Sequence, residues 1–120
     1  MTYEITVTSR FSASHQLRLY NEELEPLHGH NWTVIVTVGA AKLDSIGVVM
    51  DFHVLERRLA RVIGPFHNRH LNEVAELGGT NPSAELIATH IAESLNLPSK
   101  VKLKSVEVWE TPENRARICL

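Results

Sequence analysis

Residues 3–15 alternate between apolar and polar side chains, so the pattern repeats every two residues. One parity is mostly apolar and consists of Tyr3, Ile5, Val7, Phe11, Ala13 and His15. The other parity is polar or small and includes Thr6, Thr8, Arg10, Ser12 and Ser14. Because successive side chains of a strand point to opposite faces, this alternation predicts one long strand with a single buried face.

Three further segments have the composition or the alternation of strands. After a polar loop at 16–27, residues 28–38 are rich in Val, Ile and Thr and predict a second strand. Residues 101–111 alternate again, and residues 115–120 could pair with them as a hairpin. The segments fall into one pair at each end of the chain.

Two helices are expected between these pairs. Helical spacing at 52–63 predicts the first helix, with Asp51 as its N-cap and Gly64-Pro65 as its end. The second helix is expected to begin at Asn81-Pro82, as N-cap and first helical residue, and to end near Pro98. The expected apolar faces are Phe52, Leu55, Leu59, Val62 and Ile63 in the first helix, and Leu86, Ile87, Ile91 and Leu95 in the second.

The order of these segments predicts an α+β fold, with two helices on one face of a four-stranded antiparallel sheet. A chain of 120 residues fits one domain, residues 1–120. A sheet this small has two edges, which invite pairing with other subunits.

Composition excludes several classes of protein. The formal charge of −2, without a long basic run, argues against nucleic-acid binding, and no apolar run is long enough for a membrane span. The single cysteine, Cys119, cannot form an internal disulfide, and residues 1–4 show no secretory signal. We therefore expect a cytoplasmic protein.

Histidine is the unusual residue of this chain, with seven in total. In His28-Gly29-His30 the two imidazoles would point to one face of a strand, and His15 lies on the apolar parity of the first strand. If the two strands are neighbours, three imidazoles could meet, and three nitrogen ligands with an open position are typical of catalytic zinc. The alternative is a chance His-x-His pair and a buried histidine that only satisfies a hydrogen bond.

Glu110 shares its parity with Val106 and Val108 in the strand at 101–111. A carboxylate on an apolar face is costly unless it is paired or hydrogen-bonded. It could bind a ligand that offers several N–H donors. The alternative is that Glu110 sits at the strand end and faces water.

Five short segments, in this order, resemble the 6-pyruvoyltetrahydropterin synthase family, which includes the bacterial 6-carboxytetrahydropterin synthases of the queuosine pathway. The segments are Phe11-Ser12-Ala13-Ser14-His15, His28-Gly29-His30-Asn31-Trp32, Val49-Met50-Asp51-Phe52, Asn81-Pro82-Ser83-Ala84-Glu85 and Trp109-Glu110-Thr111. The resemblance covers almost the whole chain. It implies a tunnelling fold, in which the sheets of several subunits join into a barrel and two rings stack. The implied assembly is a homohexamer, a dimer of trimers, with active sites between subunits.

The resemblance also implies the chemistry of the site. Zinc would be bound by His15, His28 and His30, Glu110 would hold the pterin ring, and Ser83 would lie near the pterin. The implied substrate is 7,8-dihydroneopterin triphosphate. Zinc would bind its side-chain hydroxyls and lower their pKa during triphosphate loss and rearrangement or cleavage of the carbon chain.

The chain departs from the family pattern at catalytic positions. Many members carry a reactive cysteine shortly before His-Gly-His, whereas residues 22–27 contain none. The family pattern Leu-Asp-His-x-x-Leu-Asn corresponds to residues 66–72, where His67 and Asn68 replace the Asp-His pair. His67 or His70 could supply a second titrating group. Equally, His70 could simply be exposed.

One replacement has a chemical interpretation. Glu25, before His28-Gly29-His30, resembles a subgroup in which glutamate replaces the cysteine and the product is the folate precursor 6-hydroxymethyl-7,8-dihydropterin. A carboxylate near zinc can act as a general base. The alternative is one more solvated glutamate, since Glu22 and Glu23 lie beside it.

We therefore expect a zinc-dependent lyase of pterin biosynthesis that cleaves carbon–oxygen or carbon–carbon bonds. Three alternatives stay open. The first is a pterin- or purine-binding homologue without turnover. The second is a 6-carboxytetrahydropterin synthase of queuosine biosynthesis, and the third is a zinc hydrolase on an unrelated scaffold.

Overall fold

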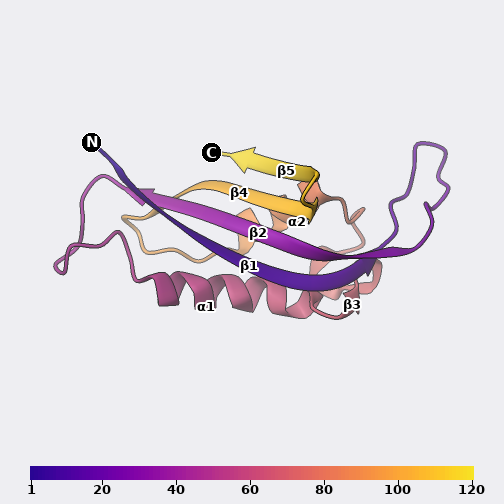
Figure 1. Ribbon diagram of the computed structural model, residues 1–120, viewed down its shortest axis with the longest axis horizontal. Coiled ribbons are helices and arrows are strands. Elements are labelled where there is room, and N and C mark those ends of the chain that lie inside the picture. The colour runs from indigo at the N-terminus through magenta and orange to yellow at the C-terminus, as the bar shows by residue number, and fades with distance from the viewer.

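The computed structural model describes residues 1–120 and contains one five-stranded sheet. The order of the strands across the sheet is β3-β1-β2-β4-β5 (Figure 1). The bounds are β1 Tyr3–His15, β2 His28–Ala40, β3 Arg69–His70, β4 Lys102–Thr111 and β5 Asn114–Cys119. Neighbouring strands are antiparallel except β3, which runs parallel to β1. The four expected strands are present, within two residues of their expected ends.

The fifth strand, β3, was not expected, so the prediction of a purely antiparallel four-stranded sheet was wrong in this respect. β3 has only two residues, and they pair with Ala13 and Ser14 of β1. A segment this short shows no alternation in sequence, and its pairing depends on a partner more than fifty residues away in the chain.

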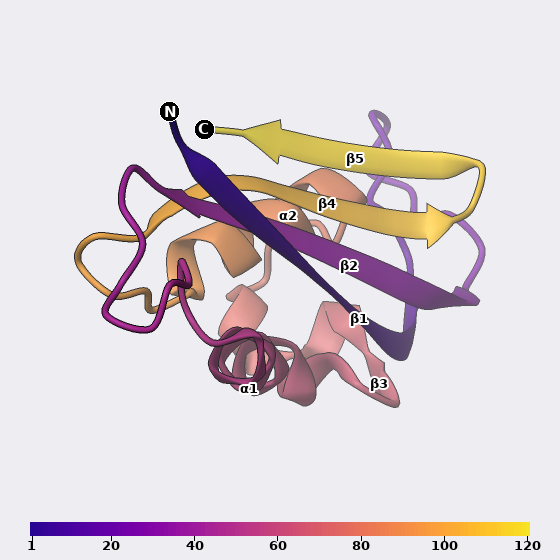
Figure 2. The ribbon, with the colours of Figure 1, turned by 60° about the vertical axis from the view of Figure 1, so that its left-hand side comes forward.

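The helices α1 (Phe52–Ile63) and α2 (Ala84–Ser94) cover the same face of the sheet, as predicted (Figure 2). Three short 3₁₀ segments, 64–66, 71–73 and 75–77, connect them. The covered face carries the apolar parity of β1 and β2, where Phe11, Trp32 and Val34 are buried. Neither helix is long and apolar enough to cross a membrane.

The two helices begin at different kinds of cap. Asp51 caps α1 as predicted, because its carboxylate accepts the backbone N–H of His53 at 2.7 Å. The cap of α2 is Ser83 and not Asn81, so that prediction was wrong. The side chain of Asn81 instead exchanges two hydrogen bonds with the backbone of Arg18, at 2.7 and 3.0 Å. The Ser83 hydroxyl oxygen accepts the Leu86 N–H at 3.1 Å.

The apolar faces of the helices are narrower than expected. Phe52 leaves 52% and Leu86 leaves 40% of its surface exposed. In α2 the buried stripe is formed by Ala84, Ile87, Ala88 and Ile91, which recur every three or four residues. Leu86 lies one position beside this stripe, so its side chain leaves the core.

Candidate metal centre and active site

Three histidines meet on the covered face of the sheet, where β1 ends and β2 begins. In the β1–β2 register His15 lies opposite His28, and Ala13 lies opposite His30. One ring nitrogen of each histidine lies within 4.8 Å of one ring nitrogen of each of the others. The residues that sequence parity placed on one face are therefore brought together by strand pairing.

Two of these rings are held in one tautomer by backbone carbonyl groups. His15 Nδ1 lies 2.8 Å from the carbonyl oxygen of Pro82, and His28 Nδ1 lies 2.8 Å from that of Pro26. A carbonyl oxygen only accepts hydrogen bonds, so each Nδ1 carries the hydrogen. In the neutral rings each Nε2 is then an unprotonated nitrogen with a free lone pair.

This arrangement fits a bound cation. The Nε2 atoms of His15 and His28 are 3.0 Å apart, and two lone pairs at this distance repel each other unless a proton or a cation neutralises them. The Nε2 atom of His30 is buried and has no hydrogen-bond partner. Histidine nitrogens that are oriented by hydrogen bonds from Nδ1 are the usual zinc ligands.

The electrostatic environment of His30 favours the neutral ligand form. Desolvation by burial is the main cause that lowers the pKa of His30 below its usual value. Its neighbours His15 and His28 lower this pKa further, while the carboxylate of Glu110 opposes the shift. Because a metal binds the neutral imidazole, the environment prepares His30 for coordination.

Two carboxylates approach this cluster. Glu110 Oε1 lies 3.6 Å from His15 Nε2, and Glu110 Oε2 lies 3.8 Å from His30 Nε2. Glu25 Oε1 lies 3.6 Å from His28 Nε2 and accepts the backbone N–H of Leu17 at 3.0 Å. Both side chains are about three-quarters buried, with 24% and 23% exposed. Neither is a fully solvated surface glutamate.

Trp32 packs against the cluster on the core side. The Trp32 ring packs edge-on against His15, with ring centroids 4.8 Å apart, and its indole N–H donates to the Ala13 carbonyl at 3.1 Å. Ser83 follows Pro82, whose carbonyl orients His15. The cap of α2 and the orientation of a cluster histidine therefore depend on adjacent residues.

His67 and His70 lie elsewhere in the same chain. The backbone N–H of Ser12 donates to His67 Nδ1 at 3.1 Å, and His70 Nδ1 lies 3.0 Å from the Ser14 hydroxyl oxygen. Ser12 and Ser14 belong to the parity opposite His15, on the face that the helices leave open. One chain therefore does not bring His67 and His70 together with the three clustered histidines.

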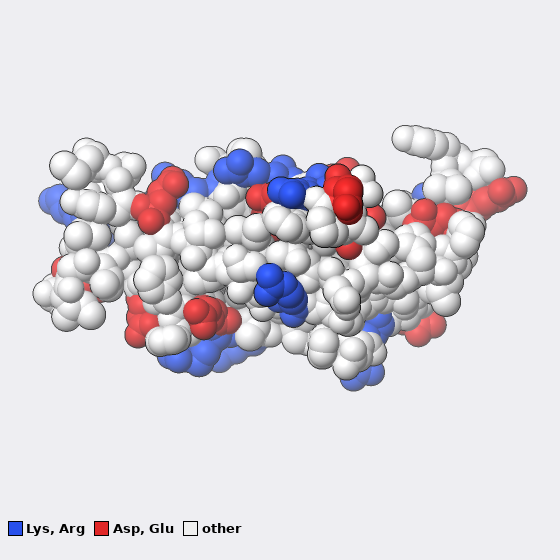
Figure 3. All heavy atoms as spheres, viewed as in Figure 1, with Lys and Arg blue, Asp and Glu red and all other residues white.

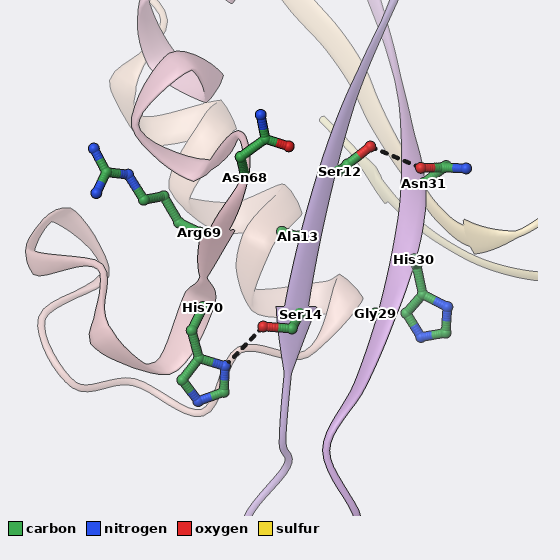
Figure 4. Close-up of a pocket in the computed structure, with 9 residues that line it drawn as sticks. All are labelled: Ser12, Ala13, Ser14, Gly29, His30, Asn31, Asn68, Arg69 and His70. Atoms are coloured by element: carbon green, nitrogen blue, oxygen red, sulfur yellow. Dashed lines mark hydrogen bonds between the residues drawn. The ribbon is translucent and has the colours of Figure 1, made fainter.

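A polar pocket of about 500 Å³ lies on that open face, between β3 and the ends of β1 and β2. Figure 4 shows the His70 ring directed toward Ser14, while the His30 ring lies on the far side of β2. His30 also lines this pocket, so the pocket and the histidine cluster meet at this residue, at the same end of β1 and β2.

Sequence reasoning missed the contacts that the carbonyl groups of Pro26 and Pro82 make with the cluster. Both orient imidazoles of the cluster, but through backbone atoms, which every residue type possesses. The Pro82 contact also joins positions that are 67 residues apart. No sequence signal marks either contact.

The fold and the cluster define a small α+β protein with a three-histidine site at the end of its sheet. Residues 4–119 match the family model of 6-pyruvoyl tetrahydropterin synthase. The chain belongs to this family, which rules out the unrelated hydrolase scaffold considered above.

Similar proteins agree with this assignment. A dihydroneopterin monophosphate aldolase from Pyrococcus furiosus is 37% identical over 116 residues, which is 94% of each chain. A putative 6-carboxy-5,6,7,8-tetrahydropterin synthase from Archaeoglobus fulgidus is 31% identical over 95% of this chain and 93% of that protein. The 6-pyruvoyl tetrahydropterin synthase of Caenorhabditis elegans has the same fold, with a TM-score of 0.80 at 22% identity over 100% of this chain and 96% of the other. The curated relatives are named as enzymes of pterin metabolism.

Proposed function

We propose that this protein is a zinc-dependent lyase that cleaves the side chain of a phosphorylated 7,8-dihydroneopterin to give 6-hydroxymethyl-7,8-dihydropterin. The position of Glu25 carries the proposal, because its carboxylate lies 3.6 Å from His28 in a cluster that contains no cysteine. The resemblance implied the triphosphate as substrate. The name of the Pyrococcus relative makes the monophosphate the first substrate to test.

In this proposal His15, His28 and His30 hold the zinc ion through their Nε2 atoms. Bound zinc polarises a coordinated hydroxyl and lowers its pKa. The support is the tautomer of His15 and His28 and the unpartnered Nε2 of His30. Trp32 restricts the freedom of the rings from the core side.

Glu110 is proposed to orient the pterin ring. Its two carboxylate oxygens can accept two N–H bonds from the amino-pyrimidinone edge, and charge-assisted bonds of this kind are strong and directional. The carboxylate lies next to His15 and His30, so a ring held there would place its side chain beside the cluster. Ser83, with a hydroxyl hydrogen free to donate, is the proposed second contact.

Glu25 is proposed to act as the general base. It removes the proton of the C2′ hydroxyl, C2′ becomes an aldehyde carbon, and the C1′–C2′ bond breaks. The electron pair moves into the C6–N5 unit of the ring, and C1′ then takes up a proton. The products are 6-hydroxymethyl-7,8-dihydropterin and a phosphorylated two-carbon aldehyde, so atoms and charge balance. The Leu17 N–H holds the carboxylate in place for this step.

The protein is proposed to work as a homohexamer. β5 and most of β1 have free edges, because β3 pairs with β1 only at Ala13 and Ser14. Free edges of this length are suited to joining sheets of neighbouring subunits. In such an assembly His67 and His70 could serve only the histidine cluster of another subunit, so the acid–base role within one chain is assigned to Glu25.

Product analysis tests this function. Zinc-loaded protein is incubated with 7,8-dihydroneopterin monophosphate or triphosphate, and the pterins are separated by chromatography. We expect 6-hydroxymethyl-7,8-dihydropterin, and a rate about 10²–10⁴-fold lower for Glu25→Gln, as is typical for loss of one general base. Glu23→Gln, in the same loop and exposed, is the matched control and should keep the rate.

Two other outcomes identify the alternatives. A carboxy product would identify a 6-carboxytetrahydropterin synthase, the activity in the name of the Archaeoglobus relative. Tight pterin binding without any product would identify the non-catalytic homologue, which the missing cysteine and Asp-His pair favour. An unchanged rate in Glu25→Gln would remove Glu25 from the mechanism.

A further inference from the structure

Three arginines of α1 line one groove on the helical side of the molecule. Arg57, Arg58 and Arg61 border a groove of about 410 Å³ that also contacts Ser94 and Asn96 at the end of α2. No carboxylate lines this groove. Figure 3 shows a group of basic side chains at the lower left edge of the molecule, where Figure 1 places α1, with acidic side chains beside it. We call this feature the arginine groove.

None of these guanidinium groups forms an ion pair with a carboxylate of the chain. All four close ion pairs of the protein are His–Glu contacts, and none involves an arginine or lysine. The only hydrogen bond of the three side chains joins Arg58 to the Asn96 carbonyl, which keeps one guanidinium at the groove. Three cations on adjacent helical positions repel each other, so a multiply charged anion would stabilise them.

A larger apolar cavity adjoins the arginine groove. It has a volume of about 770 Å³, and Val54 lines both spaces. Its apolar residues are Ala40, Leu43, Val49, Met50, Val54 and Val101. Lys42 and Lys100 add two exposed cations to its lining.

The two acidic residues of this cavity are engaged by the backbone. Asp44 accepts the N–H groups of Ile46 and Val48, and Asp51 accepts that of His53. Their carboxylates therefore already serve as local turn and helix caps. The combined space offers an apolar compartment on one side and unpaired cations on the other.

This space is separate from the histidine cluster. Pro82, just before α2, contacts His15, whereas the arginine groove contacts Ser94 and Asn96 at the other end of this helix. The helix has 11 residues and is therefore about 16 Å long.

We propose that the apolar cavity and the arginine groove together bind a nucleoside polyphosphate. The flat base would occupy the apolar cavity, and the phosphates would lie against Arg57 and Arg61, because guanidinium groups bind phosphate oxygens in a bidentate manner. Each of the two volumes, taken by itself, is in the range of small-molecule sites. This site does not depend on the proposed lyase activity.

Calorimetry on the zinc-loaded protein tests the proposal with ATP, with inorganic tripolyphosphate and with adenosine. We expect ATP to bind more tightly than either adenosine or tripolyphosphate. Arg57→Ala/Arg61→Ala should weaken ATP binding by roughly 10–100-fold, the loss typical of hydrogen bonds to charged groups. Arg10→Ala/Arg117→Ala removes two charges from the opposite face of the sheet and should leave the affinity unchanged.

Several results would overturn the proposal. Equal affinity for ATP and tripolyphosphate would show that the apolar cavity takes no part. Equal losses in the two double variants would show a bulk charge effect. Loss of ATP binding in Glu110→Gln would place the nucleotide at the histidine cluster instead. Thermal unfolding of each variant confirms that the fold is intact.

Discussion

The hydroxyl of Ser83 gives the most direct test of how the fold supports the site. Ser83→Ala removes the only side-chain acceptor for the Leu86 N–H in the first turn of α2. Loss of an N-cap costs about 0.5–2 kcal/mol. The entropy of unfolding for a chain of this length is about 0.25 kcal/mol/K, so we expect Tm to fall by about 2–8 °C. The assay is thermal unfolding at one fixed protein concentration, because subunit assembly makes Tm concentration-dependent.

Two further variants separate capping from substrate binding. Ser83→Asp keeps a good N-cap and places a negative charge at a helix N-terminus, so it should restore Tm. Ser99→Ala makes the same chemical change in an exposed loop and should leave Tm unchanged. If Ser83→Ala unfolds at the wild-type temperature and only loses pterin affinity, the capping argument is refuted. Because Pro82 orients His15, we also expect Ser83→Ala to bind zinc more weakly than Ser83→Asp.

Four other expectations concern the cluster and the assembly. Wild-type protein should contain about one zinc per chain by elemental analysis, and full occupancy in His28→Ala/His30→Ala would contradict the site. Glu110→Gln should weaken pterin binding by about 1.5–3 kcal/mol in calorimetry. Unchanged affinity would contradict the proposed contact between Glu110 and the pterin ring. Burial lowers the pKa of His30, so the unfolded state binds more protons than the folded state. The free energy of unfolding of the metal-free protein, measured in urea titrations, should therefore decrease as the pH falls below about 6.5. The decrease should be smaller in His30→Gln. Light scattering should give a multiple of three subunits, six in our proposal, whereas a zinc-bound monomer would exclude a site between subunits.

Regular alternation made the largest part of the fold predictable. The parity of β1 placed His15 on the buried face, and the parity of β4 placed Glu110 on the same face as Val106 and Val108. Both assignments depend only on the period of two in a strand, which short-range geometry fixes. Their meeting at one point then followed from the order β1-β2-β4 in the sheet.

Contacts between distant segments were not predictable in this way. The pairing of β3 with β1, the acceptance of the Ser12 N–H by His67 and the Asn81–Arg18 hydrogen bonds join positions 55 or more residues apart. Asn81 and Ser83 are both good N-cap residues in isolation. The contact with the backbone of Arg18 decided which of them caps α2.

The residues at the positions where the chain departs from the family pattern have different surroundings. His67 receives the Ser12 N–H on Nδ1, so this imidazole is engaged as an acceptor in holding the 3₁₀ segment and β3 against β1. A ring in this position needs Nδ1 unprotonated and offers only Nε2 for other work. Glu25, in contrast, is fixed by Leu17 and by the Gln16 side chain, which donates to its carbonyl, and it lies beside His28 in its own chain. In the absence of a thiol and of the Asp-His pair, the carboxylates of Glu25 and Glu110 are the proton acceptors next to the three histidines. Because Glu110 is proposed to bind the pterin ring, Glu25, in the loop that leads into β2, is the group on which we expect turnover to depend.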